Sequence, residues 1–120
     1  MAKGDDIQER FIAFAVNIIH LTSQLPKTPA GKHIAGQLLR SGTSPAPNYA
    51  EARAAESTND FVHKLKVVLK ELNETSVWLQ ISKRSKLLNE TNLIKIFKEC
   101  KELRMIIGAS ITTAEKRKKN

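Results

Sequence analysis

The chain has 120 residues, of which 41% are hydrophobic and only 5% aromatic, and its formal net charge at pH 7 is +8. This length suits one domain with an aliphatic core, and five glycines and four prolines leave little room for β-hairpins. A polar start, a single cysteine and no apolar run of about 20 residues argue against an export signal, a disulfide framework and a membrane span. We therefore expect a soluble, cytoplasmic protein that does not enter membranes.

The charge is unevenly distributed along the chain. Residues 1–60 contain six Lys or Arg and six Asp or Glu, whereas residues 61–120 contain fourteen and six. The whole excess therefore lies in the second half. Such asymmetry favours a polyanionic partner, nucleic acid before an anionic membrane. A generally basic, solvated surface is the alternative.

The first predicted helix begins near Asp5 or Asp6, whose charges suit a helix N-terminus. Apolar residues then recur at spacings of three and four up to Pro26, which is typical of a helix packed in a bundle. These residues are Ile7, Phe11, Phe14, Ile18, Leu21 and Leu25.

A second helix is predicted from about Thr28 or Pro29 to about Ala55. Residues 41–47, with the sequence SGTSPAP, interrupt it with small hydroxylated side chains and two prolines. These residues could form a loop between two short helices. The helical character of residues 48–55 favours one long helix with a kink at residues 44–47 instead, because Ser and Thr hydroxyls can satisfy carbonyls that a proline leaves free.

The third predicted helix, residues 61–82, is the clearest, and Ser57 with Asp60 supplies an N-cap signal before it. Its core seam is Phe61, Leu65, Val68, Leu72, Thr75, Leu79 and Ser82. A second stripe of mixed polarity beside the seam is either a semi-buried polar seam, with Arg40 or Arg53 as partner of its acids, or a surface that meets another molecule. The candidate residues on helices two and three are Arg40, Ser44, Asn48, Glu51, Lys64, Glu71, Glu74 and Trp78.

The fourth predicted helix follows a basic connector, residues 82–89, with Asn89 or Thr91 as its cap. Its core face is Leu93, Ile96, Phe97, Cys100, Leu103, Ile107, Ile111 and Ala114, and residues 115–120 form a short basic tail. The fold class is therefore all-α: a single domain over residues 1–120, folded as an antiparallel up-down-up-down four-helix bundle.

No motif for catalysis, metal or cofactor binding is recognisable. The three histidines fall on different helices, no glycine pattern matches a phosphate loop, and no serine lies in a nucleophile elbow. Cys100 lies on the apolar face of its helix, which favours a buried thiol over a nucleophile. We predict a non-enzymatic protein without cofactor or metal; a catalytic site that no motif marks is the alternative.

Five segments of the chain are similar to a known family. They are RSGTS at residues 40–44, NYAEA at 48–52, FVHK at 61–64, KELNET at 70–75 and WL at 78–79. With them the chain resembles the four-helix-bundle proteins of the 23S ribosomal RNA intervening-sequence family, which is related to the accessory protein of diversity-generating retroelements. The resemblance implies a non-enzymatic bundle, typically a homopentameric ring, whose basic surface contacts nucleic acid. Pro45 and Pro47 together depart from the family pattern, which has one proline or none there.

We therefore expect a basic homo-oligomer that binds RNA or DNA, RNA first, or a nucleic-acid-bound protein. Base-specific readout is not indicated, and aromatic residues for stacking single-stranded bases are few. The candidate contacts to nucleic acid are Lys66, Lys70, Lys83, Arg84, Lys86, Lys116, Arg117, Lys118 and Lys119. The alternative is a protein–protein scaffold or accessory subunit that docks its partner through the polar face of helices two and three.

Overall fold

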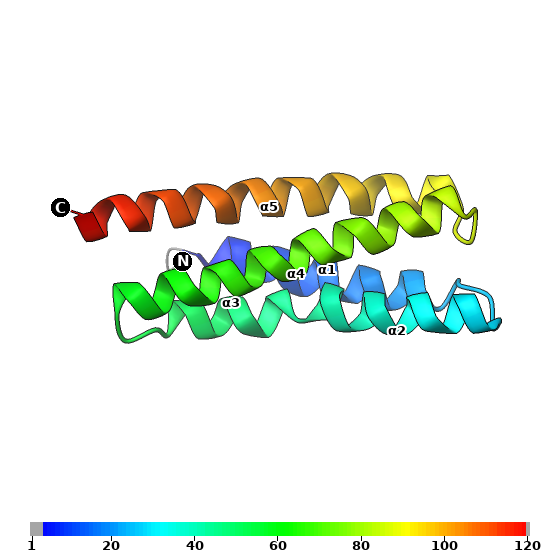
Figure 1. Ribbon diagram of the computed structural model, residues 1–120, viewed down its shortest axis with the longest axis horizontal. Helices are drawn as coiled ribbons and strands as arrows, with labels where there is room; N and C mark the ends of the chain where they lie inside the picture. Colours follow the sequence, from blue (N-terminus) through cyan, green and yellow to red (C-terminus); the bar gives the residue numbers. More distant parts are fainter. Residues whose placement is uncertain (1–3, 120) are drawn as a thin grey trace.

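The computed structural model describes residues 4–119, and the side chains of residues 4–118. Five helices follow one another in this part of the chain, without a β-strand: α1 (Asp5–Thr22), α2 (Pro29–Thr43), α3 (Pro45–Arg53), α4 (Thr58–Arg84) and α5 (Glu90–Lys119). Figure 1 shows the chain running along the long axis of the molecule and reversing its direction at each of three turns. The predicted all-α bundle is confirmed.

The helices form an elongated bundle of 51 × 27 × 20 Å. In cross-section α1 packs against α2 and α3, these two pack against α4, α4 packs against α5, and α5 returns to α1. The helix α1 therefore lies diagonally opposite α4. One side of the bundle is consequently built by α4 and α5 alone, the two helices that carry most of the positive charge.

Side-chain caps mark where three of the helices begin. Thr28 Oγ1 accepts a hydrogen bond from the backbone N–H of Gly31 (3.1 Å) before α2, and Ser57 Oγ accepts one from Asp60 (3.0 Å) before α4. Asn89 Oδ1 accepts from the N–H of Thr91 (2.9 Å) at the start of α5. Each bond satisfies a backbone donor that has no partner within the helix. The predicted caps Ser57 and Asn89 are confirmed.

The junction of α2 and α3 is a kink. Ser44 has helical backbone angles (φ −62°, ψ −35°), its N–H donates to the carbonyl of Arg40, and its own carbonyl accepts from Asn48, both at 3.2 Å. The Ser44 and Thr43 hydroxyls donate to carbonyls one turn back, those of Arg40 and Leu39, a pattern that bends helices. The helical path thus continues past the prolines, as the kink interpretation expects.

The core is almost entirely aliphatic. Fully buried side chains include Phe11, Phe14, Ile18, Leu38, Leu65, Leu72, Leu79, Leu93, Leu103 and Ile107. The seams predicted for the four helical segments supply most of it. A buried hydrogen bond between two hydroxyl groups also crosses it, joining Thr75 Oγ1 of α4 and Ser41 Oγ of α2 (2.9 Å).

The structure departs from the sequence predictions at several positions. In the first turns of α4 the buried residue is Val62, whereas Phe61 is only half-buried. Phe97 on α5 is also half-buried, at the surface between α4 and α5. Residues 115–119 do not form a separate tail but continue α5, because Glu, Lys and Arg are good helix formers and Glu115 pairs with Lys66 of α4 (3.0 Å).

Candidate nucleic-acid interface

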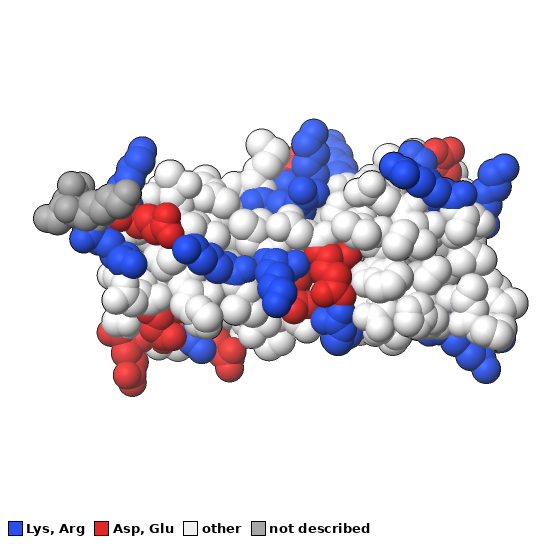
Figure 2. Space-filling model, in the orientation of Figure 1, with Lys and Arg blue, Asp and Glu red and all other residues white. Residues whose placement is uncertain are grey.

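Positive side chains gather along α5 and toward the two ends of the molecule. Figure 2 shows Lys and Arg over the α5 edge of the bundle and near both ends of the long axis, with Asp and Glu beside them in several places. The α4–α5 turn lies at one end, and the last turns of α5 lie at the other (Figure 1). At 1.5 Å per residue, the length of α5 separates these two ends by about 45 Å.

At the α4–α5 turn, Lys83, Arg84 and Lys86 are all exposed. The chain leaves α4 through two backbone hydrogen bonds, from Lys86 N–H to the Lys83 carbonyl and from Leu87 N–H to the Ser82 carbonyl, both 3.1 Å. This is the Schellman pattern of a helix end, and it places Lys86 at φ 59°, where glycine is usual. Lys83 pairs with Glu90 (3.3 Å) on the surface, a contact too exposed to hold the lysine firmly.

The other predicted phosphate-binding residues lie toward the opposite end. Lys66 forms the ion pair with Glu115, while Lys70 is exposed and has no ion-pair partner among the described residues. Lys116, Arg117 and Lys118 are exposed on the final turns of α5. The side chain of Lys119 lies outside the described residues. The structure therefore brings the predicted residues into two groups far apart, and not into one site.

Between these groups an open groove of about 820 Å³ runs between α4 and α5. It is lined by Leu69, Asn73, Ser76 and Gln80 of α4 and by Phe97, Lys98, Lys101, Arg104 and Met105 of α5. A second hollow of about 360 Å³, lined by Gln80, Lys83, Arg84 and Phe97, shares two residues with it. Positive charge therefore extends from the α4–α5 turn toward the middle of the molecule.

The positive charge of the groove is not neutralised by its lining, because neither hollow is lined by any of the described Asp and Glu residues. The acids of this part of α5, Glu99 and Glu102, face α1, where Arg10 holds both of them. Arg10 Nε donates to Glu99 Oε2 (2.9 Å) and Arg10 Nη2 to Glu102 Oε2 (3.0 Å). These contacts, the hydrogen bond to Glu99 first, raise the pKa of Arg10.

Three cations of the groove, Lys98, Lys101 and Arg104, are not among the residues predicted from the sequence, although they are spaced three residues apart. That spacing keeps side chains on neighbouring parts of one helix surface. Glu99 and Glu102 alternate with them, so that the segment looks nearly neutral when charges are counted along the chain. A count of charges by helix face would have found the basic stripe.

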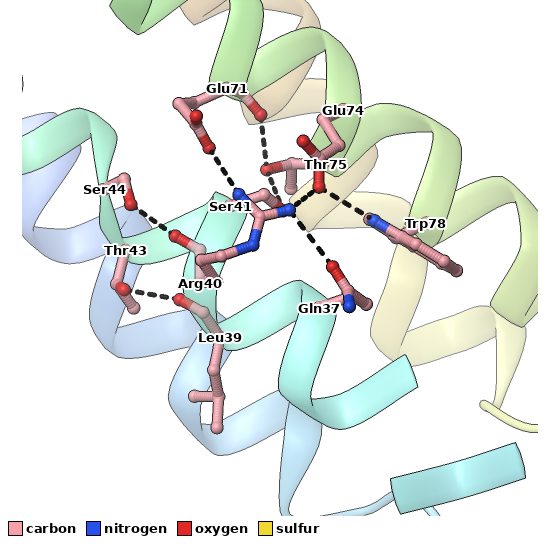
Figure 3. A network of polar contacts seen from close by, with 10 residues as sticks. All are labelled: Gln37, Leu39, Arg40, Ser41, Thr43, Ser44, Glu71, Glu74, Thr75 and Trp78. Carbon is pink, nitrogen blue, oxygen red and sulfur yellow. Dashed lines mark hydrogen bonds and ion pairs between the residues drawn. The ribbon is translucent and has the colours of Figure 1, made fainter. Parts of the chain in front are cut away.

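The polar residues predicted on α2 and α4 meet in a seam centred on Arg40 (Figure 3). Arg40 Nη1 donates to Glu71 Oε2 (3.3 Å), and Arg40 Nη2 contacts Glu74 Oε2 and Gln37 Oε1, the latter at 3.1 Å. Trp78 Nε1 donates to the same Glu74 oxygen (3.2 Å). Glu71 and Glu74 thus share Arg40 as a partner within the chain. Of the two interpretations of this stripe, a semi-buried polar seam or a surface that meets another molecule, this arrangement corresponds to the first.

The remaining predicted members of this face are less closely bound. Ser44 bonds the backbone of Arg40, whereas the side chains of Asn48, Glu51 and Lys64 form no hydrogen bond or ion pair with described residues. Arg53, the other proposed partner of the acids, instead donates to Asp5 Oδ1 and Gln8 Oε1, both at 2.7 Å. The interface role of these residues stays a prediction.

Cys100 is buried in the core, with its Sγ 3.5 Å from the Leu72 carbonyl oxygen. Burial raises the pKa of this thiol to about 11, which keeps it protonated near neutral pH. Within residues 4–118 no three His, Cys, Asp or Glu side chains come together as a metal site would need. In the same part of the chain, no helix combines the length and apolarity that crossing a membrane requires.

The chain was compared with known families, curated proteins and solved structures. The family model described as 23S rRNA-intervening sequence protein matches residues 5–109. No curated protein matches the chain significantly. A crystal structure of a protein of unknown function from the S23 ribosomal protein family, from Bacteroides thetaiotaomicron, is 32% identical over 88% of this chain and 97% of that chain, with a TM-score of 0.82. The chain therefore belongs to the 23S rRNA-intervening sequence protein family.

Proposed function

We propose that the protein binds nucleic acid, RNA in preference to DNA, through the basic face of α4 and α5, and that it catalyses no reaction. The observation that carries this proposal is the α4–α5 groove, which has Lys and Arg on its rim and no acidic side chain in its lining. The family description refers to 23S rRNA, which favours RNA as the polyanion.

The geometry of the face favours contacts to phosphates over contacts to bases. Basic groups extend along the length of α5, from Lys83 and Arg84 at one end to Lys116 and Arg117 at the other. Charges spread in this way can meet successive phosphates of an extended strand or a duplex edge. Binding should therefore be largely independent of sequence and strongly weakened by salt.

We further propose that the protein assembles with copies of itself, as a pentamer if it follows the family resemblance. Ile12, Val16 and Ile19 form an exposed apolar stripe on α1, and each is more than 40% exposed. Leu39 on α2 adds to the apolar surface of this half of the bundle. A ring would repeat the basic face and multiply modest contacts to one polyanion. A mass of 13.4 kDa, that of the monomer, measured by light scattering at micromolar protein concentration would contradict the proposed assembly.

A salt titration tests the nucleic-acid proposal. Affinity for a fluorescein-labelled single-stranded RNA, measured by anisotropy, should fall with salt at a log–log slope of about −0.7 per phosphate contacted. The double variant Lys83→Gln, Arg84→Gln should reduce the slope by about one to two units per protomer engaged. The matched control Lys27→Gln, Lys32→Gln removes two exposed charges in and just before α2. It should leave the slope of the salt dependence almost unchanged.

The opposite outcome has a clear meaning. If the wild-type protein binds neither RNA nor DNA at about 50 mM salt, where phosphate contacts are strong, the proposal is wrong. A protein–protein scaffold or accessory subunit that docks through the polar face of α2 and α4 then becomes the better explanation. The Arg40–Glu71–Glu74 seam would be the first place to look for its contacts.

A further inference from the structure

We propose that the α4–α5 groove holds one unpaired nucleotide of the bound RNA, with its base on Phe97 and its neighbouring phosphates on Lys98 and Lys101. This inference rests on the proposed nucleic-acid function and names the site and the kind of RNA. Three properties of the groove carry it: an open apolar floor, polar groups with hydrogen-bonding capacity to spare, and a rim of cations that form no ion pair with described residues.

The floor of the groove can accept a flat base. Leu69 and Phe97 are half-buried there, beside Met105, which is 64% exposed. The volume of about 820 Å³ falls within the roughly 300–1,000 Å³ typical of small-molecule sites. Every base has an apolar face that can stack on an aromatic ring, so that one phenylalanine suffices for one base of any identity.

The wall formed by α4 offers groups for the edge of a base. Asn73 Oδ1 accepts from Arg104 Nε (3.0 Å), and the Asn73 side-chain N–H groups have no partner in the described part of the chain. Gln80 Nε2 donates to Ser76 Oγ (3.4 Å), and the side-chain oxygen Oε1 of Gln80 accepts no hydrogen bond from a described residue. The lining of the groove therefore offers both a donor and an acceptor, and a base edge presents both types.

The rim provides charge for phosphates. Lys98 and Lys101 are exposed and form no ion pair with described residues. Among the described residues, Arg104 donates to neutral oxygens, those of Asn73 and of Ser76 (3.3 Å), and no carboxylate offsets its charge. Since the three cations lie beside the apolar floor, a base seated on the floor would bring its flanking phosphates to them.

A continuous duplex cannot use this floor, because its bases are stacked inside the helix and must be flipped out at an energetic cost. A bulged or single-stranded nucleotide pays little or none of that cost. An acidic amphipathic peptide helix is the rival occupant, but it needs apolar contact along several turns. The α4 wall of the groove instead carries three polar residues, Asn73, Ser76 and Gln80, which interrupt such apolar contact. This favours the nucleotide over the peptide.

The test compares three RNA probes that share one labelled strand: the single strand, its perfect duplex, and a duplex with a one-nucleotide bulge. At fixed salt, the full-length protein should bind the single strand and the bulged duplex about tenfold more tightly than the perfect duplex, as expected for stacking of one base. Phe97→Leu keeps an apolar side chain but removes the ring. It should abolish this preference and leave duplex affinity unchanged.

Matched controls separate the groove from general effects. Phe61→Leu changes another half-buried phenylalanine, which lies outside the groove, and should preserve the preference. Lys98→Gln with Lys101→Gln should weaken binding of all three probes, whereas Lys95→Gln, on the part of α5 that faces α1, should have little effect. Thermal melts followed by circular dichroism establish that each variant is folded.

Four results would overturn the inference. Equal affinity for all probes, with no effect of Phe97→Leu, would refute the nucleotide site while the salt-dependent function stands. No binding of any probe would refute both. A change in oligomeric state caused by the Lys98 and Lys101 substitutions would assign the groove to a second copy of the chain. Displacement by an acidic amphipathic peptide, without preference among RNAs, would assign it to a protein partner.

Discussion

Gly42 on α2 packs closely against Ile18 of α1, and its replacement by Ala tests that packing. An added Cβ would lie 2.8 Å from Ile18 Cγ1 and 2.9 Å from Ile18 Cγ2, well inside the roughly 3.5–4.0 Å of a normal carbon contact. Ile18 is fully buried and branched at Cβ, so it cannot rotate its γ carbons out of the way. One of the two helices must therefore shift.

The expected size of the effect follows from two opposing terms. Overpacking a core costs about 1–3 kcal/mol. Replacing Gly by Ala inside a helix gains about 0.5–1 kcal/mol. We expect Gly42→Ala to lower the free energy of unfolding by about 1 kcal/mol, since the packing term is the larger.

Gly36, on the same helix, is the matched control. A Cβ added there meets nothing within 4 Å, and Gly36 is exposed. Gly36→Ala should therefore raise the free energy of unfolding by about 0.5–1 kcal/mol, the helix term alone. The opposite signs of the two substitutions make the comparison independent of errors in the absolute scale.

Urea denaturation followed by circular dichroism, at one protomer concentration for all variants, measures both effects. A double-mutant cycle adds the mechanism: in an Ile18→Ala background the clashing γ carbons are gone, and Gly42→Ala should stabilise as Gly36→Ala does. If Gly42→Ala stabilises the otherwise unaltered protein as much as Gly36→Ala, then α1 does not pack on α2 at this point.

Three further predictions concern single residues. Gly31→Ala should be more destabilising than Gly42→Ala in the same assay, because the new Cβ would collide with the backbone carbonyl of Pro26, which cannot rotate away. Lys86→Gly should raise the unfolding free energy by about 1 kcal/mol, because its φ of 59° strains any residue with a Cβ. Cys100 should resist alkylation in the native protein. Because its pKa is raised from 9.0 to about 11 on folding, its contribution to stability should be lost as pH rises from 9 to 11; equal pH dependence in wild type and Cys100→Ala would contradict this.

Most of the fold can be predicted from the sequence because the packing of its helices is periodic. Leu65, Val68 and Leu72 recur at the spacing that faces a helix neighbour, and the structure buries all three completely. Helix caps are equally predictable, because Ser57 accepts a hydrogen bond from a backbone N–H only three residues away. Features that depend on contacts between neighbouring residues are thus readable from the chain itself.

The depth of a side chain in the bundle is less predictable. Phe61 and Phe97 match the core period, yet both are half-buried at the edges of their helices. The period places a residue within a broad arc of the helix surface. Whether it reaches the core depends on how the neighbouring helix is rotated, which no local pattern contains. For this reason Phe97, which the period assigns to the core, lies in the groove.

The candidate groove depends on a separation of charge that only the packed bundle creates. Lys98 and Glu102 are four residues apart on α5, a spacing at which opposite charges pair. Arg10 of α1 takes Glu102 instead, together with Glu99, and leaves Lys98 without a carboxylate partner among the described residues. A cation on α1, far away in the sequence, thereby decides that the opposite side of α5 is positive. The charge excess of residues 61–120 is visible in the sequence, but its concentration on one face follows from this contact between the two ends of the chain.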